Sequence, residues 1–166
     1  MRPTLRLAAA ALLAATPLIA FAVPPTPAPE TLPIYDSTSL GALAIESASK
    51  AAADSGRRLF VNFGTNDCAP CRVVNDAIYE EPFFTAFLAQ FVPVFVDVAP
   101  GTSGHELLAR YGIDAGKGFP ALVLSDEKLR VEETTKEGEM SAVAAKGKEA
   151  VRGWILKRFR KTETAP

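Results

Sequence analysis

The sequence is poor in the side chains that usually bind metals, with two cysteines and one histidine among 166 residues. A closed structural zinc site normally takes four cysteine or histidine ligands, which is more than this chain has. The formal net charge is only −1, whereas nucleic-acid-binding proteins usually present a strongly basic face. We therefore expect no bound metal, no cofactor and no nucleic-acid partner.

The sequence also lacks an uninterrupted apolar run of about 20 residues, the length that spans a membrane. Its main apolar run, Leu7 to Ala20, is shorter and contains a proline. Two arginines precede this run and Ala20-Phe21-Ala22 ends it, so residues 1–22 have the three parts of a secretory signal peptide. An uncleaved anchor is the alternative. With cleavage near Ala22, we expect a periplasmic or secreted protein that is not inserted in the membrane, in a compartment where disulfides persist.

Five prolines between Pro24 and Pro33 predict a stiff, extended linker at residues 23–38. One domain should follow at residues 39–161. Its patterns of apolar residues predict the following elements: helices at 40–55 (with Ser39 as cap), 68–79 and 82–90, a short helix at 105–111, a closing helix at 140–159, and strands at 59–63, 92–98, 120–125 and 129–134. This order predicts an α/β fold, with a central mixed sheet of four to five strands and helices on both faces.

The two cysteines, Cys68 and Cys71, follow the first predicted strand and open the next helix. A Cys-x-x-Cys pair after a strand is typical of a dithiol redox site. Cys68 lies at the helix start, where unpaired N–H groups and the helix dipole favour a thiolate, so it is the predicted nucleophile. Cys71, one turn further along, is the predicted resolving thiol. Pro70 fits the first helical turn and stiffens the loop.

Two other roles for the cysteines are a structural disulfide and the carriage of Cu(I) or zinc by two thiolates. Closing a loop of about four residues stabilises a protein by about 1.9 kcal/mol, against about 3 kcal/mol for 15 residues. Because the gain in stability is so small, the spacing favours a disulfide that is reduced and re-formed over one that only stabilises the fold. The single histidine, His105, lies in a predicted helix, where we expect a surface position.

The chain resembles the thioredoxin superfamily, in particular its secreted bacterial members. The resemblance rests on Phe60-Val61-Asn62-Phe63 leading to Cys68-Ala69-Pro70-Cys71, and on Gly118 to Leu124, which is similar to the family's cis-proline loop. It implies a thioredoxin-like fold over about residues 40–160 and exchange of disulfides through a Cys68 mixed disulfide. It also implies that Pro120, preceded by Phe119, is cis and lies beside the sulfur atoms.

Three features depart from the family pattern. Asp67 precedes Cys68 where thioredoxins usually have tryptophan, and its charge opposes the helix dipole, so we expect the pKa of Cys68 to be only mildly lowered. Asn62 stands where thioredoxins have a buried aspartate, and an amide cannot accept the proton of the resolving thiol. Either another group accepts this proton or the resolving step is slow. The alternative role for Asn62 is to form hydrogen bonds in the core. Changes at residues 64–66 and 114–117 alter the substrate groove.

The dipeptide Ala69-Pro70 lacks the histidine that is typical of strongly oxidising members of the family, which favours a reductant or an isomerase. We therefore predict an exported, monomeric thiol–disulfide oxidoreductase that acts as a reductase on protein disulfides. Its partners would be exported proteins with disulfides or a membrane thiol reductant. The alternative is a binding protein on the same fold, either a metal carrier or a partner-docking module.

Overall fold

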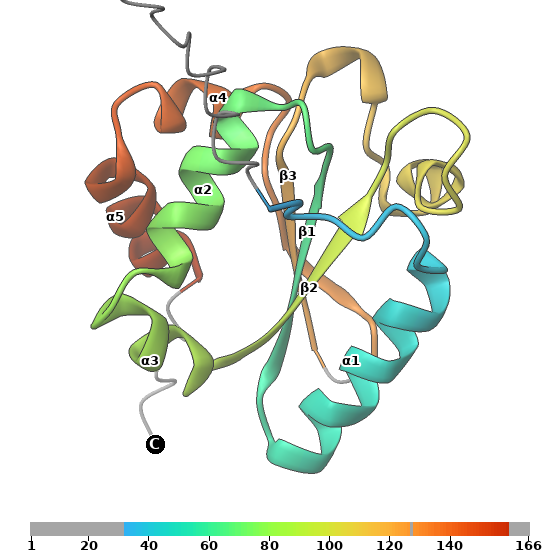
Figure 1. The fold of residues 1–166 in the computed structure, drawn as a ribbon. Helices are drawn as coiled ribbons and strands as arrows, with labels where there is room; N and C mark the ends of the chain where they lie inside the picture. The colour runs from blue at the N-terminus through green and yellow to red at the C-terminus, as the bar shows by residue number, and fades with distance from the viewer. Residues whose placement is uncertain (1–31, 127, 160–166) are drawn as a thin grey trace, which may run out of the picture. The chain divides into compact units, whose positions relative to one another are not determined.

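The computed structural model describes residues 32–126 and 128–159 (Figure 1). The predicted signal peptide, residues 23–31 of the predicted linker and residues 160–161 of the predicted domain lie outside this part of the chain. None of the helices in the described residues has the length and apolar character needed to cross a membrane.

The centre of the domain is a four-stranded mixed sheet with the order β2-β1-β3-β4. Strand β1 (Arg58–Gly64) pairs in parallel with β2 (Phe91–Asp97) and antiparallel with β3 (Ala121–Ser125). Strand β3 also pairs antiparallel with β4 (Val131–Thr134). Residues 59–64 of β1 are all buried, because this inner strand is covered on both faces.

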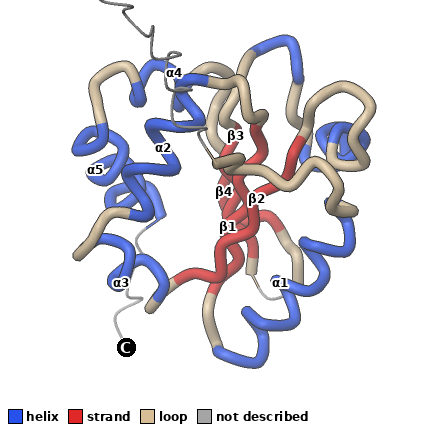
Figure 2. Tube along the Cα trace, viewed as in Figure 1, coloured by secondary structure: helices blue, strands red, loops and turns tan. Residues whose placement is uncertain are grey.

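Helices cover both faces of the sheet, which confirms the predicted fold class (Figures 1 and 2). One face carries α1 (Gly41–Ser55) and the 3-10 helix η1 (His105–Tyr111), whose apolar side chains pack on Leu59, Val61 and Phe63. The other face carries four helices packed around Phe60: α2 (Ala69–Tyr79), α3 (Phe83–Leu88), α4 (Glu139–Ala144) and α5 (Lys148–Phe159). Because side chains alternate along a strand, Asn62 points to the same face as Phe60, toward α2.

Two predictions about helix ends are wrong. Ser39 does not cap the first helix, since Leu40 is its N-cap residue and forms no side-chain capping bond. Ser103, in a distant loop, caps the helix instead. Its hydroxyl accepts a hydrogen bond from the Gly41 N–H and donates one to the Ser39 carbonyl. The closing helix is not continuous, because Gly147 adopts a positive φ of 93° between α4 and α5, a backbone conformation that glycine adopts readily.

The domain also begins earlier than the predicted boundary at residue 39. Residues 32–38, here called the N-terminal strap, fall in the predicted linker, yet Tyr35 in this segment is only 1% exposed. The backbone N–H groups of Ile34 and Tyr35 both donate to Asn66 Oδ1, at 2.8 and 3.0 Å. The described end of the predicted linker is therefore part of the folded domain, which the proline-rich composition alone did not indicate.

Candidate active site

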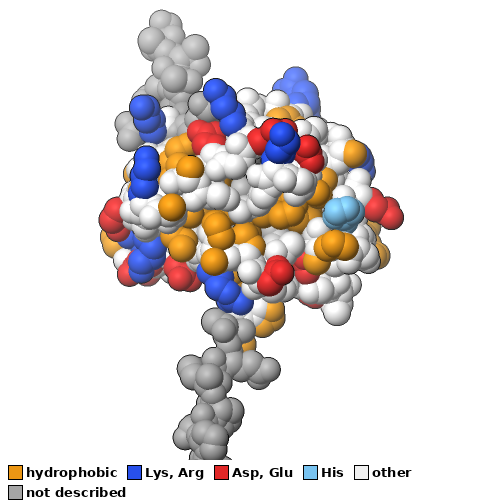
Figure 3. Space-filling model, turned by 90° about the horizontal axis from the view of Figure 1, so that it is seen from above, with side chains coloured by type: hydrophobic (Ala, Val, Ile, Leu, Met, Phe, Trp, Pro, Cys, Tyr) orange, Lys and Arg blue, Asp and Glu red, His pale blue; other side chains and the backbone are white. Residues whose placement is uncertain are grey.

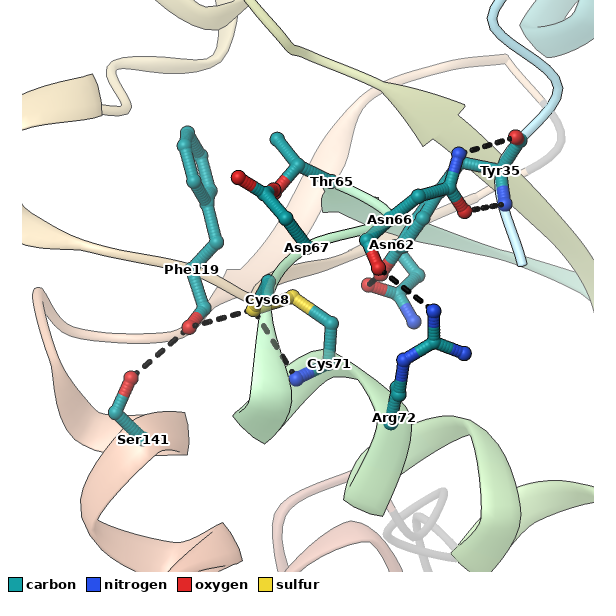
Figure 4. Close-up of a disulfide and its surroundings, with 10 residues drawn as sticks. All are labelled: Tyr35, Asn62, Thr65, Asn66, Asp67, Cys68, Cys71, Arg72, Phe119 and Ser141. Carbon is teal, nitrogen blue, oxygen red and sulfur yellow. Dashed lines mark hydrogen bonds between the residues drawn. A yellow bond between two sulfur atoms is a disulfide. The ribbon is translucent and has the colours of Figure 1, made fainter. Parts of the chain in front are cut away.

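Cys68 and Cys71 form a disulfide where β1 leads into α2 (Figure 4), with their Cα atoms 5.2 Å apart. Cys68 is the N-cap residue of α2, and its sulfur accepts from the Cys71 N–H at 3.1 Å. Cys68 is partly exposed, whereas Cys71 is fully buried. An attacking thiolate can therefore approach Cys68, while Cys71 can be reached only from inside the protein.

The Phe119-Pro120 segment lies beside Cys68. Its peptide bond is cis, and the Phe119 carbonyl oxygen is 3.4 Å from Cys68 Sγ. A sulfur in a disulfide has no proton to donate, so this is a close contact that becomes a possible hydrogen bond when Cys68 is reduced. The Ser141 hydroxyl of α4 donates to the same carbonyl at 2.9 Å, and thereby holds it toward the sulfur.

The active-site loop before Cys68 carries an exposed carboxylate, that of Asp67. The Thr65 hydroxyl donates to Asp67 Oδ1, and this bond, helped by a backbone N–H, lowers the pKa of Asp67 below its ordinary value. Asp67 is therefore ionised at neutral pH, immediately before the residue at the helix start. A negative charge at this end of a helix disfavours a second negative charge on Cys68.

The same loop is fastened to the N-terminal strap through Asn66. Its side chain accepts the two N–H groups of the strap and donates to the Tyr35 carbonyl at 2.9 Å. On the helix side, the Arg72 guanidinium donates to the Asn66 backbone carbonyl at 2.8 Å. Asn66, two positions before Cys68, thus joins the N-terminal strap, the active-site loop and helix α2.

A buried polar pair lies on the Cys71 side of the disulfide (Figure 4). The Tyr35 hydroxyl donates to Asn62 Oδ1 at 3.1 Å, and both residues are almost completely buried. Asn62 Nδ2 has no hydrogen-bond partner among the described residues. Asn62 thus does more than fill space in the core, and its partner is a hydroxyl from a segment that the sequence assigned to a linker.

The structure brings together most of the predicted site residues. Cys68, Cys71, Phe119 and Pro120 surround the disulfide, and Asn62 lies beneath it in β1. Pro70 occupies the first turn of α2, and Asp67 points toward Thr65, away from the core.

Sequence analysis missed Tyr35 and Ser141, and it assigned Asn66 to the substrate groove without predicting its bonds to the N-terminal strap. The pair Ile34-Tyr35 at the end of a proline-rich stretch was a signal for an ordered segment, since apolar and aromatic residues are scarce in true linkers. No comparable signal marks Ser141, which is separated from Phe119 by 22 residues.

A grouping of side chains able to hold a metal ion is not found in the described residues, where no three of His, Cys, Asp and Glu converge. The single histidine is partly buried, and its Nδ1 lies 3.0 Å from the Val98 carbonyl oxygen. This nitrogen is therefore engaged with the backbone at the end of β2.

The chain matches a known protein family in sequence and known structures in fold. Residues 41–126, about half of the chain, match a family model described as thioredoxin-like. No curated protein matches the chain in sequence. Among solved structures, a disulphide isomerase from Xylella fastidiosa Temecula1 is similar with a TM-score of 0.70 and 23% identity, over 76% of this chain and 97% of that one. At this identity, the similarity establishes the fold.

Two further structures match less well, each with a TM-score of 0.45. One is mitochondrial thioredoxin 3 from Saccharomyces cerevisiae in its oxidized form, 14% identical over 67% of this chain and 92% of that one. The other is the C-terminal domain of DsbD from Neisseria meningitidis, 18% identical over 64% of this chain and 87% of that one.

Proposed function

This chain belongs to the thioredoxin-like family and has the fold and dithiol of a thiol–disulfide oxidoreductase, and we propose that it reduces disulfides in exported proteins. The observation that carries the proposal is the asymmetric disulfide, with partly exposed Cys68 at the start of α2 and buried Cys71 behind it. In the reduced protein, the Cys68 thiolate attacks a substrate disulfide and forms a mixed disulfide. Cys71 then attacks Cys68 Sγ, which re-forms the internal bridge and releases the second substrate thiol.

The charge beside Cys68 supports the reducing direction. Strong oxidants of this kind stabilise their reduced form through a strongly acidic nucleophilic thiol. Here Asp67 is ionised next to Cys68, which works against such stabilisation. The dithiol is then a better electron donor, because its oxidised form is the comparatively favoured one.

The surface around the disulfide suits a protein substrate. Figure 3 looks onto the end of the domain at which β1 leads into α2, and apolar side chains gather across the middle of this face, with charged side chains mostly around them. An apolar centre with a polar rim is the usual composition of a protein–protein contact. The partners we propose are exported proteins with disulfides, with a membrane thiol reductant as the electron source.

The first experiment measures the reduction potential of the Cys68–Cys71 pair. The protein is equilibrated in glutathione buffers, and its alkylated thiols are counted. We expect a value below about −230 mV, typical of a reductant. A value above about −180 mV would place the protein among isomerases and oxidants instead. If the pair forms no internal disulfide at any potential, the protein is a binding module on this fold and the redox proposal is wrong.

The proposal of export is tested separately, by expressing the full chain in a bacterium and sequencing the N-terminus of the protein in the periplasmic fraction. A mature chain that begins at Val23 is the expected result. A protein that stays in the cytoplasm with Met1 intact would exclude the periplasmic location.

A further inference from the structure

Asn62 of β1 lies beneath the resolving cysteine, at the position where the family resemblance implies a buried acid, and it is bonded to the Tyr35 hydroxyl. We propose that Tyr35 is a positioning residue for Cys71: when the disulfide opens, the Tyr35 hydroxyl donates a hydrogen bond to the Cys71 thiolate. The inference rests on the proposed dithiol function and identifies the group that assists its second step.

The geometry around Gly64 places the two atoms close together. A Cβ atom added at Gly64 would lie 2.2 Å from Tyr35 Oη and 2.9 Å from Cys71 Sγ. The hydroxyl oxygen and the sulfur are therefore at most 5.1 Å apart, the sum of these two distances. Only glycine leaves room for the hydroxyl at this point, and the sulfur gains freedom to rotate toward it when the disulfide opens.

The hydroxyl is held in place by contacts on both sides of its residue. Asn66 binds the backbone of the strap through three hydrogen bonds, of which two involve the Tyr35 N–H and carbonyl. The ring packs against Phe95, with the ring centroids 6.0 Å apart. Only 1% of the residue is exposed, so water does not compete for the hydroxyl.

The unpaired amide nitrogen of Asn62 explains how the hydrogen bond can change direction. In the oxidised protein, Tyr35 donates to Asn62 Oδ1, and Nδ2 has no partner within the part of the chain that the structure describes. A half turn of the amide brings Nδ2 to the Tyr35 oxygen as a donor, which frees the hydroxyl proton for the thiolate. A chain from Asn62 through Tyr35 to Cys71 results, and such chains strengthen each member.

The hydroxyl acts as a donor and not as a base. Burial, followed by the nearby Asp97 carboxylate, raises the pKa of Tyr35 far above its ordinary value, so it remains protonated throughout. Before attack, the Cys71 thiol loses its proton to water that enters the site once the disulfide is open. The Cys71 thiolate then forms a bond with Cys68 Sγ, the bond from Cys68 to the substrate sulfur breaks, and the leaving thiolate takes a proton from water.

Two charged groups, Asp97 and Arg72, lie near Tyr35, and their effects on Cys71 must be distinguished from the effect of the hydroxyl. Asp97, which pairs with Gly64 across β1 and β2, is almost buried and accepts the Ala99 N–H at 2.9 Å. Arg72 on α2 is engaged with the Asn66 carbonyl. An Asp97→Asn variant therefore accompanies the Tyr35 variant.

The test uses the reduced full-length protein mixed with excess 5,5′-dithiobis(2-nitrobenzoate) in a stopped-flow instrument. Attack by Cys68 releases one coloured thiolate in a phase that depends on reagent concentration, and attack by Cys71 on the mixed disulfide releases the second in a phase that does not. Tyr35→Phe keeps the ring and removes the hydroxyl. We expect the second phase to slow about tenfold at pH 7, and its pH midpoint to rise by about one unit.

The first phase should stay within about twofold of the wild type, because the Tyr35 hydroxyl lies on the Cys71 side of the disulfide, bonded to Asn62. Tyr79→Phe, a matched loss of a hydroxyl from a half-exposed tyrosine on α2, should leave both phases unchanged. Thermal unfolding of each variant establishes that the fold is retained.

An unchanged second phase in Tyr35→Phe would overturn the inference, as would an equal slowing by Asp97→Asn alone, which would assign the effect to that carboxylate. These results are distinct from failure of the proposed function. If wild-type protein shows no second phase, both proposals fall. If it shows a Tyr35-dependent second phase but its potential lies above about −180 mV, only the reducing direction is wrong.

Discussion

Asp67 is the residue that most distinguishes this site electrostatically. Its carboxylate is fixed by the Thr65 hydroxyl and remains ionised at neutral pH. It stands at the positive end of α2, where it competes with Cys68 for the stabilising effect of the helix. The sequence predicted this opposition, and the structure adds the hydrogen bond that keeps the carboxylate at the helix start.

Replacing Asp67 with asparagine should make the Cys68 thiol more acidic, because a like charge next to it is removed. We expect the iodoacetamide alkylation rate of the reduced protein at pH 6 to rise about two- to fivefold, with a smaller change at pH 9. Glu106→Asn, an exposed acid on η1, serves as control. A wild-type pKa of Cys68 below about 5 would contradict the opposition, because the thiol would then already be strongly acidified.

Helix α2 is the element that connects the site to the rest of the domain. Cys68 is its N-cap residue, Cys71 lies in its first turn, and its far end contacts α5. Glu80, just past Tyr79, pairs with Lys148 at 2.8 Å and with Arg152, while Arg152 also donates to the Ala77 carbonyl at 2.9 Å. These contacts fix the direction of α2 and thus the position of the disulfide against the sheet.

The Glu80 contacts predict a pH-dependent stability. Hydrogen bonds from Lys148 and then Arg152 lower the pKa of Glu80 from 4.5. A lowered folded-state pKa means that the contribution is fully present above the unfolded value and is lost as the pH falls through the folded value. Glu80→Gln should therefore lower the Tm by about 1–4 °C at pH 7, and this difference should vanish near pH 2.

Calorimetry of the wild type, Glu80→Gln and Glu46→Gln at the two pH values measures this effect. Glu46 is exposed on α1, and its replacement should change the Tm little at either pH. A Glu80→Gln difference that persists at pH 2 would show that the loss comes from packing and not from charge.

At the scale of the whole domain, the N-terminal strap is part of the folded unit and of the site. It supplies a buried ring, three hydrogen bonds with Asn66 and the hydroxyl that pairs with Asn62. A chain that begins at Ser39, the sequence-predicted domain start, should therefore unfold about 5–10 °C lower than one that begins at Val23. Equal Tm values for the two would contradict a structural role for the strap.

The sequence by itself determined the architecture and the chemistry. The apolar runs of the sheet strands, the spacing of Cys68 and Cys71, and the Phe119-Pro120 segment each carry a local pattern, because strands, helix starts and dithiol sites are made by residues close together in the chain. The order of elements, the mixed sheet and the nucleophilic and resolving roles of the two cysteines followed from these patterns. The positions where prediction failed, such as the cap at Ser39 and the closing helix, depend on single loop residues.

Only the tertiary structure decided what surrounds the dithiol. Tyr35 lies 27 residues from Asn62, and Ser141 lies 22 residues from Phe119, so no local pattern records either contact. Each contact requires that a whole set of elements first pack and leave a space of the right size, as at Gly64, where even a methyl group would displace the Tyr35 hydroxyl. That packing determines which group can donate to the Cys71 thiolate. The Tyr35 hydroxyl is an effective donor because it is buried, and its burial exists only in the assembled domain.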